Sequence, residues 1–232
     1  MSSTEVAEMT KLYENCQRMM CIAYANEMAD ACQRLSEVLS SNDRQKGGCA
    51  EPVTINPWEV SRAAATKPFG YMPCTPSLGV RGHCIPVNPF YLLSNSDFPL
   101  LKACTERMQK RPALIGDRIM SKTSFSRTSN YRPRVLVVGL GFKRGQGVLS
   151  NSPGRALAFH LLSQYDVYVE FADPLVRSEA VPIPRLDDGL DWRVEVLRRF
   201  DTIVVAVDQV GLDMQVLKET QAQGTTVEWF CD

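Results

Sequence analysis

The fold of the second half of the chain is decided by the segment RVLVVGLG at residues 134–141. Its aliphatic run, Val135–Val138, is typical of a parallel strand that is buried on both faces. A helical pattern begins at Pro153. Further strand patterns lie at 167–171, 200–207 and 226–230. This alternation of strand and helix predicts a doubly wound parallel sheet, so the fold class is α/β.

Two glycines, Gly139 and Gly141, follow the first strand at once and raise the question of a dinucleotide site. The full G-x-G-x-x-G fingerprint requires a third glycine at position 144, where the chain has Arg144. A partial glycine motif is weak evidence. The motif alone therefore does not predict a dinucleotide site.

The first half of the chain begins with a pattern that predicts one long helix at 4–41, without glycine or proline. Apolar residues recur at helical spacing at Met9, Leu12, Tyr13, Cys16, Met19, Met20, Ala23, Met28, Cys32, Leu35, Val38 and Leu39. Such a helix would be about 55 Å long, too long to be buried by its own small domain. We expect part of it to pack on a second subunit; the alternative is a helix that lies across two domains of one chain.

Shorter helices are expected to begin at Pro57, capped by Asn56, near Asp97 and at Ala113. Polar and glycine-rich residues around 42–56 predict a surface loop. Small, polar and basic residues after position 121 indicate a linker between domains. These patterns predict a helical domain at 1–121, a linker at 122–133 and a sheet domain at 134–232.

The most unusual chemistry lies in the loop SLGVRGHCIPVNP at residues 77–89. Glycines precede the His83-Cys84 pair, and prolines stiffen the chain that follows. One interpretation is a rigid loop that presents the thiol of Cys84. The other is a tight structural turn with a buried, inert thiol. The residues alone leave both open.

Composition excludes several classes of function. Lys+Arg and Asp+Glu are equal at 26 each, so nucleic acid or an acidic membrane is not expected as a partner. No apolar run approaches the roughly 18 residues of a membrane span, and the N-terminus shows no signal peptide. Eight cysteines without a C-x-x-C pair, and two histidines, give no zinc pattern. We expect a cytoplasmic protein with reduced thiols and without a bound metal.

The loop also carries a resemblance to a known family. Residues 82–87 and 89–92 resemble the catalytic loop of the UDP-glucose/GDP-mannose dehydrogenase family. The upstream segments 57–60 and 63–73 are most similar to its UDP-N-acetylhexosamine 6-dehydrogenase branch. Residues 8–15 and 23–28 are similar to the family's central dimer helix, and the segment from Arg134 onwards resembles its C-terminal domain, which implies a Rossmann-like unit. The resemblance implies a homodimer through helix 4–41.

The resemblance implies a set of site residues that acts on a small-molecule substrate. Cys84 would be the nucleophile, with Lys11 and Asn15 beside it to stabilise an oxyanion and orient water. We add His83 as a proton carrier and Asn88 as a donor. The candidate substrate-binding residues are Phe69, Tyr71, Arg81, Gly82 and Lys143. Of these, Lys143 matches a family lysine that contacts the nucleotide-sugar, whereas Phe69 and Tyr71 fit a pocket wall or a core equally well.

Several positions depart from the family pattern. Asn88 stands where the family has an aspartate, and an amide cannot accept a proton there. Arg81 replaces a loop glycine and Leu78 a proline. The family's acidic-acidic-x-Arg-Glu-Ser-Pro signature is altered before its final Ser-Pro, with Gly147, Val148, Ser150 and Asn151 at the four charged positions.

Three hypotheses about function follow. The resemblance starts near residue 5 and does not include the family's N-terminal NAD-binding domain, so no nicotinamide cofactor is expected. The first hypothesis is a repurposed, nicotinamide-independent enzyme of isomerase, cyclase or lyase type that acts on a carbonyl compound. The second is a non-catalytic pseudoenzyme or regulatory partner of a full-length dehydrogenase. The third is a fragment of an NAD-dependent UDP-N-acetylhexosamine or UDP-glucose 6-dehydrogenase.

Overall fold

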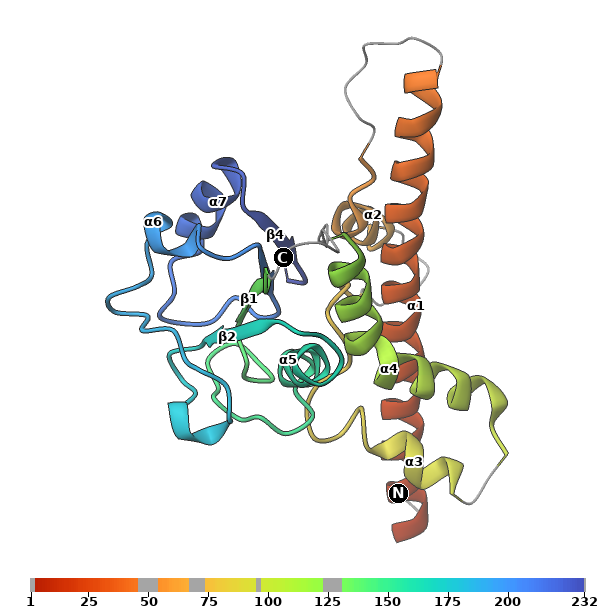
Figure 1. Ribbon diagram of the computed structural model, residues 1–232. Coiled ribbons are helices and arrows are strands. Elements are labelled where there is room, and N and C mark those ends of the chain that lie inside the picture. Colours follow the sequence, from red (N-terminus) through yellow and green to blue (C-terminus); the bar gives the residue numbers. More distant parts are fainter. Residues whose placement is uncertain (1–2, 46–53, 67–73, 95–96, 123–130, 232) are drawn as a thin grey trace.

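The computed structural model describes residues 3–45, 54–66, 74–94, 97–122 and 131–231. It consists of a helical unit built along one long helix and a unit built around a parallel sheet (Figure 1). The long helix, α1 (Thr4–Gln45), confirms the predicted helix at 4–41 and ends four residues later. No helix among the described residues combines the length and the apolarity that crossing a membrane requires.

Three further helices pack along α1: α2 (Pro57–Ala64), α3 (Asn88–Leu93) and α4 (Pro99–Lys122). The predicted cap of α2 is confirmed, because the Asn56 side chain accepts hydrogen bonds from the backbone N–H groups of Trp58 and Glu59. The two helices expected near Asp97 and at Ala113 were wrong as separate elements. They form the single helix α4, with Pro112 inside it. Pro112 is buried, and packing on both sides of α4 outweighs the hydrogen bond that a proline cannot make.

The sheet unit contains β1 (Arg134–Val138), β2 (Tyr168–Ala172), β3 (Thr202–Val205) and β4 (Thr226–Trp229). The strands are parallel in the order β2-β1-β3-β4, which confirms the predicted parallel sheet. Its helices are α5 (Pro153–Gln164), α6 (Val194–Leu197) and α7 (Met214–Ala222), with a 3₁₀ turn at Ser178–Ala180. Leu157 and Leu161 of α5 belong to one core cluster, and Leu197 of α6 and Leu217 of α7 belong to another. Successive side chains along a strand point to opposite faces of the sheet: Val135 and Val137 of β1 belong to the first cluster, and Leu136 and Val138 belong to the second. Both faces of the sheet are therefore covered.

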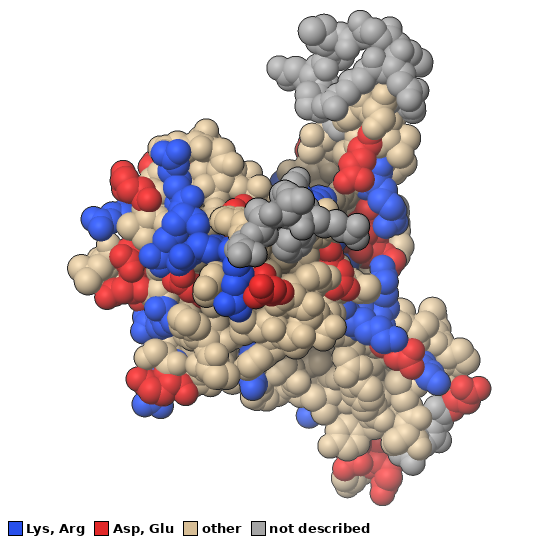
Figure 2. Space-filling model, in the orientation of Figure 1, with Lys and Arg blue, Asp and Glu red and all other residues tan. Residues whose placement is uncertain are grey.

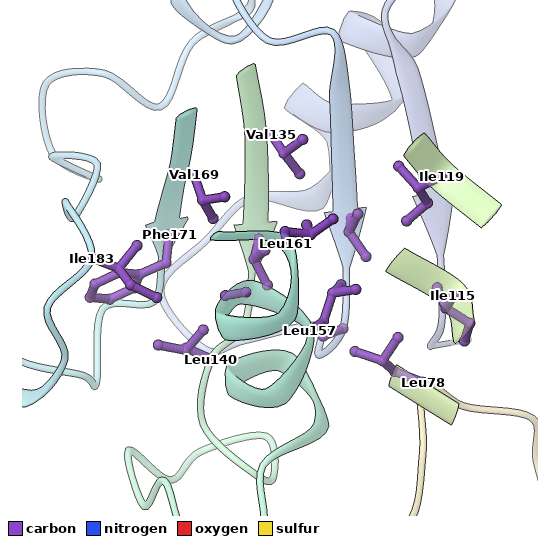
Figure 3. Packing of buried hydrophobic residues seen from close by; sticks show 14 of the residues in the cluster. Leu78, Ile115, Ile119, Val135, Leu140, Leu157, Leu161, Val169, Phe171 and Ile183 are labelled. Atoms are coloured by element: carbon purple, nitrogen blue, oxygen red, sulfur yellow. The ribbon is translucent and has the colours of Figure 1, made fainter. Parts of the chain in front are cut away.

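Helix α4 joins the two units because its two halves belong to different cores. Leu101 and Met108 pack with the α1 residues of the helical core. Ile115 and Ile119, about two and three turns after Met108, belong to the cluster that covers the sheet (Figure 3). Leu78, from the loop before Cys84, lies in that same cluster. The two units therefore share buried apolar surface.

Polar contacts reinforce the α4–α5 part of this junction. The Asp117 carboxylate lies 2.6 Å from His160 Nε2 and accepts a hydrogen bond of 2.8 Å from the Tyr165 hydroxyl. These two hydrogen bonds hold the pKa of Asp117 below its ordinary value. The next residue of α4, Arg118, bonds to Gln33 of α1 and to Glu228 of β4.

A buried polar cluster fixes the chain segment that leads to the Cys84 loop. Asn26, fully buried on α1, accepts the Ser77 N–H at 2.7 Å. Arg111 of α4 donates through Nε to the Ser77 carbonyl at 3.1 Å and through Nη1 to Asp30 of α1 at 2.7 Å. The Arg111 side chain is only 5% exposed and that of Asp30 17%. Both backbone groups of Ser77 are thus held by side chains of two different helices.

Replacing Arg111 should therefore cost far more stability than replacing a nearby exposed arginine. We expect Arg111→Met to lower the free energy of unfolding by about 3–5 kcal/mol, because Asp30 and the Ser77 carbonyl lose a buried partner. The matched control is Arg107→Met, whose exposed pair with Glu27 should contribute less than about 1 kcal/mol. Urea unfolding measures both values. Equal losses in the two variants would show that the cluster does not hold the loop.

Candidate functional site

The loop that carries Cys84 is fastened on its other side to the sheet unit. Gly82 adopts a φ of 101°, which favours glycine, and its carbonyl accepts a hydrogen bond of 3.0 Å from Asn151 Nδ2. The His83 ring lies edge-on to Phe142, with 5.7 Å between the ring centroids. Both partners come from the segment between β1 and α5. The loop thus bridges the two units.

The side chain of Cys84 is exposed on this bridge. Its carbonyl accepts the N–H groups of Val87 at 3.1 Å and Asn88 at 2.9 Å, so the chain turns directly into α3. The interpretation of Cys84 as a buried structural thiol is therefore wrong: the residue is exposed, while its carbonyl is held by two backbone hydrogen bonds. The thiol is accessible to a molecule in solution.

A cavity of about 490 Å³ lies beside the loop, at the carboxyl edge of the sheet. Its described lining comes from the loop and the two residues before Ser77 (Thr75, Pro76, Arg81) and from the segments after β1, β3 and β4 (Phe142, Lys143, Arg144, Val207, Asp208, Phe230, Cys231). Strands β1 and β3 are neighbours whose chains run on to opposite sides of the sheet. The cavity therefore occupies the switch point, where open parallel sheets bind their ligands.

Two cationic side chains in this cavity have no carboxylate partner among the described residues: Arg81 and Lys143. Burial removes water from the Arg81 guanidinium and thereby lowers its pKa. Lys143 is exposed at the mouth. Arg144, by contrast, pairs with Asp208. The cavity therefore offers uncompensated positive charge, which suits phosphate groups.

The glycine turn after β1 is occupied by contacts within the protein, which leave no space for a dinucleotide. Gly141 donates its N–H to Asp173 Oδ2 at 2.8 Å, and a Cβ at Gly141 would meet the Gln146 carbonyl. Asp173, fully buried after β2, also accepts from Leu175 N and from Gln209 Nε2. Helix α5 begins only at Pro153, so no helix N-terminus follows the turn directly. This geometry agrees with the interpretation of Gly139-x-Gly141 as an incomplete motif.

The other residues of the expected site are placed as follows. Lys11 and Asn15 share one stretch of α1, where Asn15 Nδ2 donates to the Lys11 carbonyl at 2.9 Å. No described cavity includes these two residues or Cys84, so their joint role stays a prediction. The Asn88 amide nitrogen is buried without a partner among the described residues, which leaves it available as a donor. Phe69 and Tyr71 lie outside the described residues.

Sequence reasoning missed the residues that hold the site in shape. Asn151 was noted only as a departure from the family pattern, yet it anchors Gly82, and its φ of 49° is positive. The hydrogen bond between Gln209 and Asp173 joins the chain after β3 to the end of β2. Asp173 also accepts the N–H of Gly141, so the pair holds the glycine turn after β1. The only sequence signal for this pair was an aspartate at the end of a strand.

Comparison with known proteins identifies the helical unit. The model of the UDP-glucose/GDP-mannose dehydrogenase family, central domain, matches residues 5–39 and 45–106. The chain contains the central domain of this family. The match covers α1, the Cys84 loop and the start of α4, so the family's central domain is the unit that carries the loop.

Individual relatives extend the similarity into the sheet unit. A UDP-N-acetyl-D-mannosamine dehydrogenase of Campylobacter jejuni is 27% identical over 77% of this chain and 39% of its own length. A UDP-N-acetyl-D-glucosamine 6-dehydrogenase of Pseudomonas aeruginosa is 30% identical over 77% of this chain and 38% of its own. The structure of a UDP-D-ManNAc dehydrogenase from Pyrococcus horikoshii matches 93% of this chain with a TM-score of 0.69 and 25% identity, and the match covers 46% of that chain. The chain thus spans about two fifths of the length of the curated relatives.

The exposure of Cys84 predicts the order in which the thiols react. At pH 8, iodoacetamide should alkylate Cys84 at least tenfold faster than the buried Cys16, because burial raises the pKa of the Cys16 thiol and shields its sulfur. Timed labelling of the native protein, followed by peptide mass spectrometry, gives both rates. Labelling of Cys16 at the same rate as Cys84 would contradict this placement of the loop.

Proposed function

We propose that this chain binds a nucleoside diphosphate sugar in the cavity at the carboxyl edge, and that Cys84 adds to a carbonyl group of the bound molecule. The observation that carries the proposal is the uncompensated positive charge of Arg81 and Lys143 beside the loop that exposes Cys84. The diphosphate would lie between these two cations, and the sugar would extend towards the thiol. The similarity to UDP-N-acetylhexosamine dehydrogenases supports this class of ligand.

The proposed step at Cys84 is a simple addition. The sulfur forms a bond to the carbonyl carbon, the C–O π bond opens, and the thiol proton ends on the oxygen. Lys11 and Asn15 are proposed to stabilise the developing oxyanion, while His83 carries the proton and Asn88 donates a hydrogen bond. Such an adduct can begin an isomerisation, cyclisation or C–C cleavage without an electron acceptor.

The turn after β1 supports a reaction that does not use a nicotinamide bound to this sheet. Asp173 stands at the end of β2, where a dinucleotide-binding sheet presents an acidic residue to the ribose. Here its carboxylate is fully buried and occupied by three protein donors. A ribose hydroxyl has no access to it in this geometry.

Calorimetric titration with UDP tests the binding half of the proposal. UDP should bind, and Arg81→Gln and Lys143→Gln should each weaken binding by about tenfold, because each variant removes one charge-assisted hydrogen bond to phosphate. The matched control is Lys218→Gln on the exposed face of α7, which should leave the affinity unchanged. Wild-type affinity in both cavity variants would refute the site.

Protection of Cys84 from alkylation tests the second half of the proposal, the addition of the thiol to a carbonyl group. A nucleotide-sugar aldehyde should slow the alkylation of Cys84 by iodoacetamide, and the protection should disappear in Arg81→Gln at the same aldehyde concentration. UDP alone should protect less, since it offers no carbonyl. Equal protection by UDP and by the aldehyde would leave a binding site in which Cys84 forms no adduct, against the proposed addition.

A second role, as a partner subunit, is favoured by the free face of α1. Large apolar side chains on this helix are exposed at Val6, Met9, Tyr13, Tyr24, Met28, Leu35, Val38 and Leu39. At about 100° per residue they fall within about a third of the circumference, next to the face that packs on α4. Figure 1 shows α1 at the edge of the molecule. We propose that this stripe pairs with a second copy of the chain or with the same helix of a full-length dehydrogenase.

Light scattering during gel filtration tests the pairing. The wild-type chain should elute as a dimer at micromolar concentration, and Tyr24→Glu should elute as a monomer, because it places a charge on a residue that is 63% exposed in the stripe. Arg18→Glu, on another face of α1, is the matched control and should remain dimeric. A monomeric wild type that also fails to co-elute with a full-length relative would remove the partner role.

A further inference from the structure

A second cavity, of about 340 Å³, lies between the two units on the far side of the chain segment that precedes the Cys84 loop. Helices α1, α2 and α4 form one side of it, and β4 forms the other. Among its described lining residues it shares only Pro76 and Phe230 with the carboxyl-edge cavity. Its volume is in the range of small-molecule sites.

Two buried hydrogen-bond donors on its lining residues have no partner in the part of the chain that the structure describes. Trp58 Nε1 and Arg118 Nε are both inaccessible to solvent and unpaired among the described residues. The other two indole N–H groups of the chain are satisfied: Trp192 donates to the Asp213 carbonyl at 2.9 Å and Trp229 to Gln221 Oε1 at 3.1 Å. Buried donors are normally paired, so two unpaired ones at one cavity indicate a missing acceptor.

The walls of the cavity indicate what kind of molecule supplies that acceptor. Trp58, Trp229 and Phe230 line it with aromatic surface. Arg118 extends this surface, because its guanidinium carbon lies 5.9 Å from the centre of the Phe230 ring. Flat aromatic and cationic surfaces of this kind favour a planar ring.

The charges that line the cavity leave one positive charge in excess. Arg111 is neutralised by Asp30 at 2.7 Å. Arg118 and Lys122 share the single carboxylate of Glu228, at 2.8 and 3.8 Å. An occupant with one negative charge would balance the cavity, and the two oxygens of a carboxylate would supply acceptors for both unpaired donors.

We propose that this cavity is a binding site for a small aromatic carboxylate of one or two fused rings. Rotation of the two side chains would turn Trp58 Nε1 and Arg118 Nε towards the carboxylate, which accepts from both, and the ring lies against Trp229 and Phe230. The site is separate from the carboxyl-edge cavity and does not depend on the function proposed for Cys84. Because it is formed by both units, its occupant would hold β4 against the helical unit.

The indole N–H signals in a ¹H–¹⁵N TROSY spectrum test this proposal, since each tryptophan gives one resonance. Titration with 2-naphthoate should shift the Trp58 resonance downfield, as its N–H gains a charged acceptor, and should perturb Trp229 less. The Trp192 signal should stay in place and serves as the internal control. A Trp58 resonance that does not move at millimolar 2-naphthoate would overturn the proposal.

Matched variants distinguish a specific hydrogen bond to the carboxylate from non-specific apolar binding. Trp58→Phe keeps an aromatic wall without the donor and should bind 2-naphthoate about tenfold more weakly. Trp192→Phe should bind it with unchanged affinity. Arg118→Lys keeps the charge facing Glu228 but lacks Nε–H, and should also weaken binding.

Neutral 2-naphthalenemethanol should bind at least tenfold more weakly than 2-naphthoate. Unchanged affinity in Trp58→Phe, or equal affinity for the neutral analogue, would refute the carboxylate site; the remaining indole signals report whether each variant is folded.

Discussion

The structure depends on how Ser77 is held between two helices. Asn26 of α1 accepts its N–H, Arg111 of α4 donates to its carbonyl, and the same Arg111 is neutralised by Asp30. None of these groups can be removed without leaving another buried and unsatisfied, which is why the cluster acts as a unit. It fixes the start of the Cys84 loop on the helical side. Asn151 and Phe142 of the sheet unit hold Gly82 and His83, directly before Cys84, so the position of Cys84 is set by both units together.

Helix α4 makes this double attachment possible. Its first half is buried against α1 and its second half against the sheet, with Pro112 at the transition. Gly79 lies where the two meet: a Cβ there would be 3.3 Å from Pro153 and 3.5 Å from Pro112. The loop, α4 and α5 thus approach one another closely at this point. Both cavities lie at the seam between them, and each is lined from both sides.

Local patterns in the sequence predicted the elements well, because α1 and the strands follow from periodicity alone. They failed at Pro112, where burial on two sides overrides the local preference of proline to end a helix. They also failed for the anchors of the loop. Asn26, Ser77 and Arg111 are separated by 51 and 34 residues, so no local spacing connects them. The Cys84 loop was found because its own chemistry is unusual, whereas the cluster that positions it consists of ordinary residue types. The partial burial of Arg81 likewise depends on contacts that only the folded chain brings together.

The two uncompensated cations of the carboxyl-edge cavity come from different units, and this bears on how such a site works. Lys143 belongs to the sheet unit, next to the turn that Asp173 and Gln209 hold closed. Arg81 belongs to the loop, four residues after Ser77. A diphosphate bridging both would therefore bind only while the Ser77 cluster and α4 keep the units in register. The same ligand would draw the loop towards the sheet edge. Under the proposed function, substrate binding and the placement of Cys84 are then one event, because the cation that holds the phosphate lies on the same rigid loop as the nucleophile.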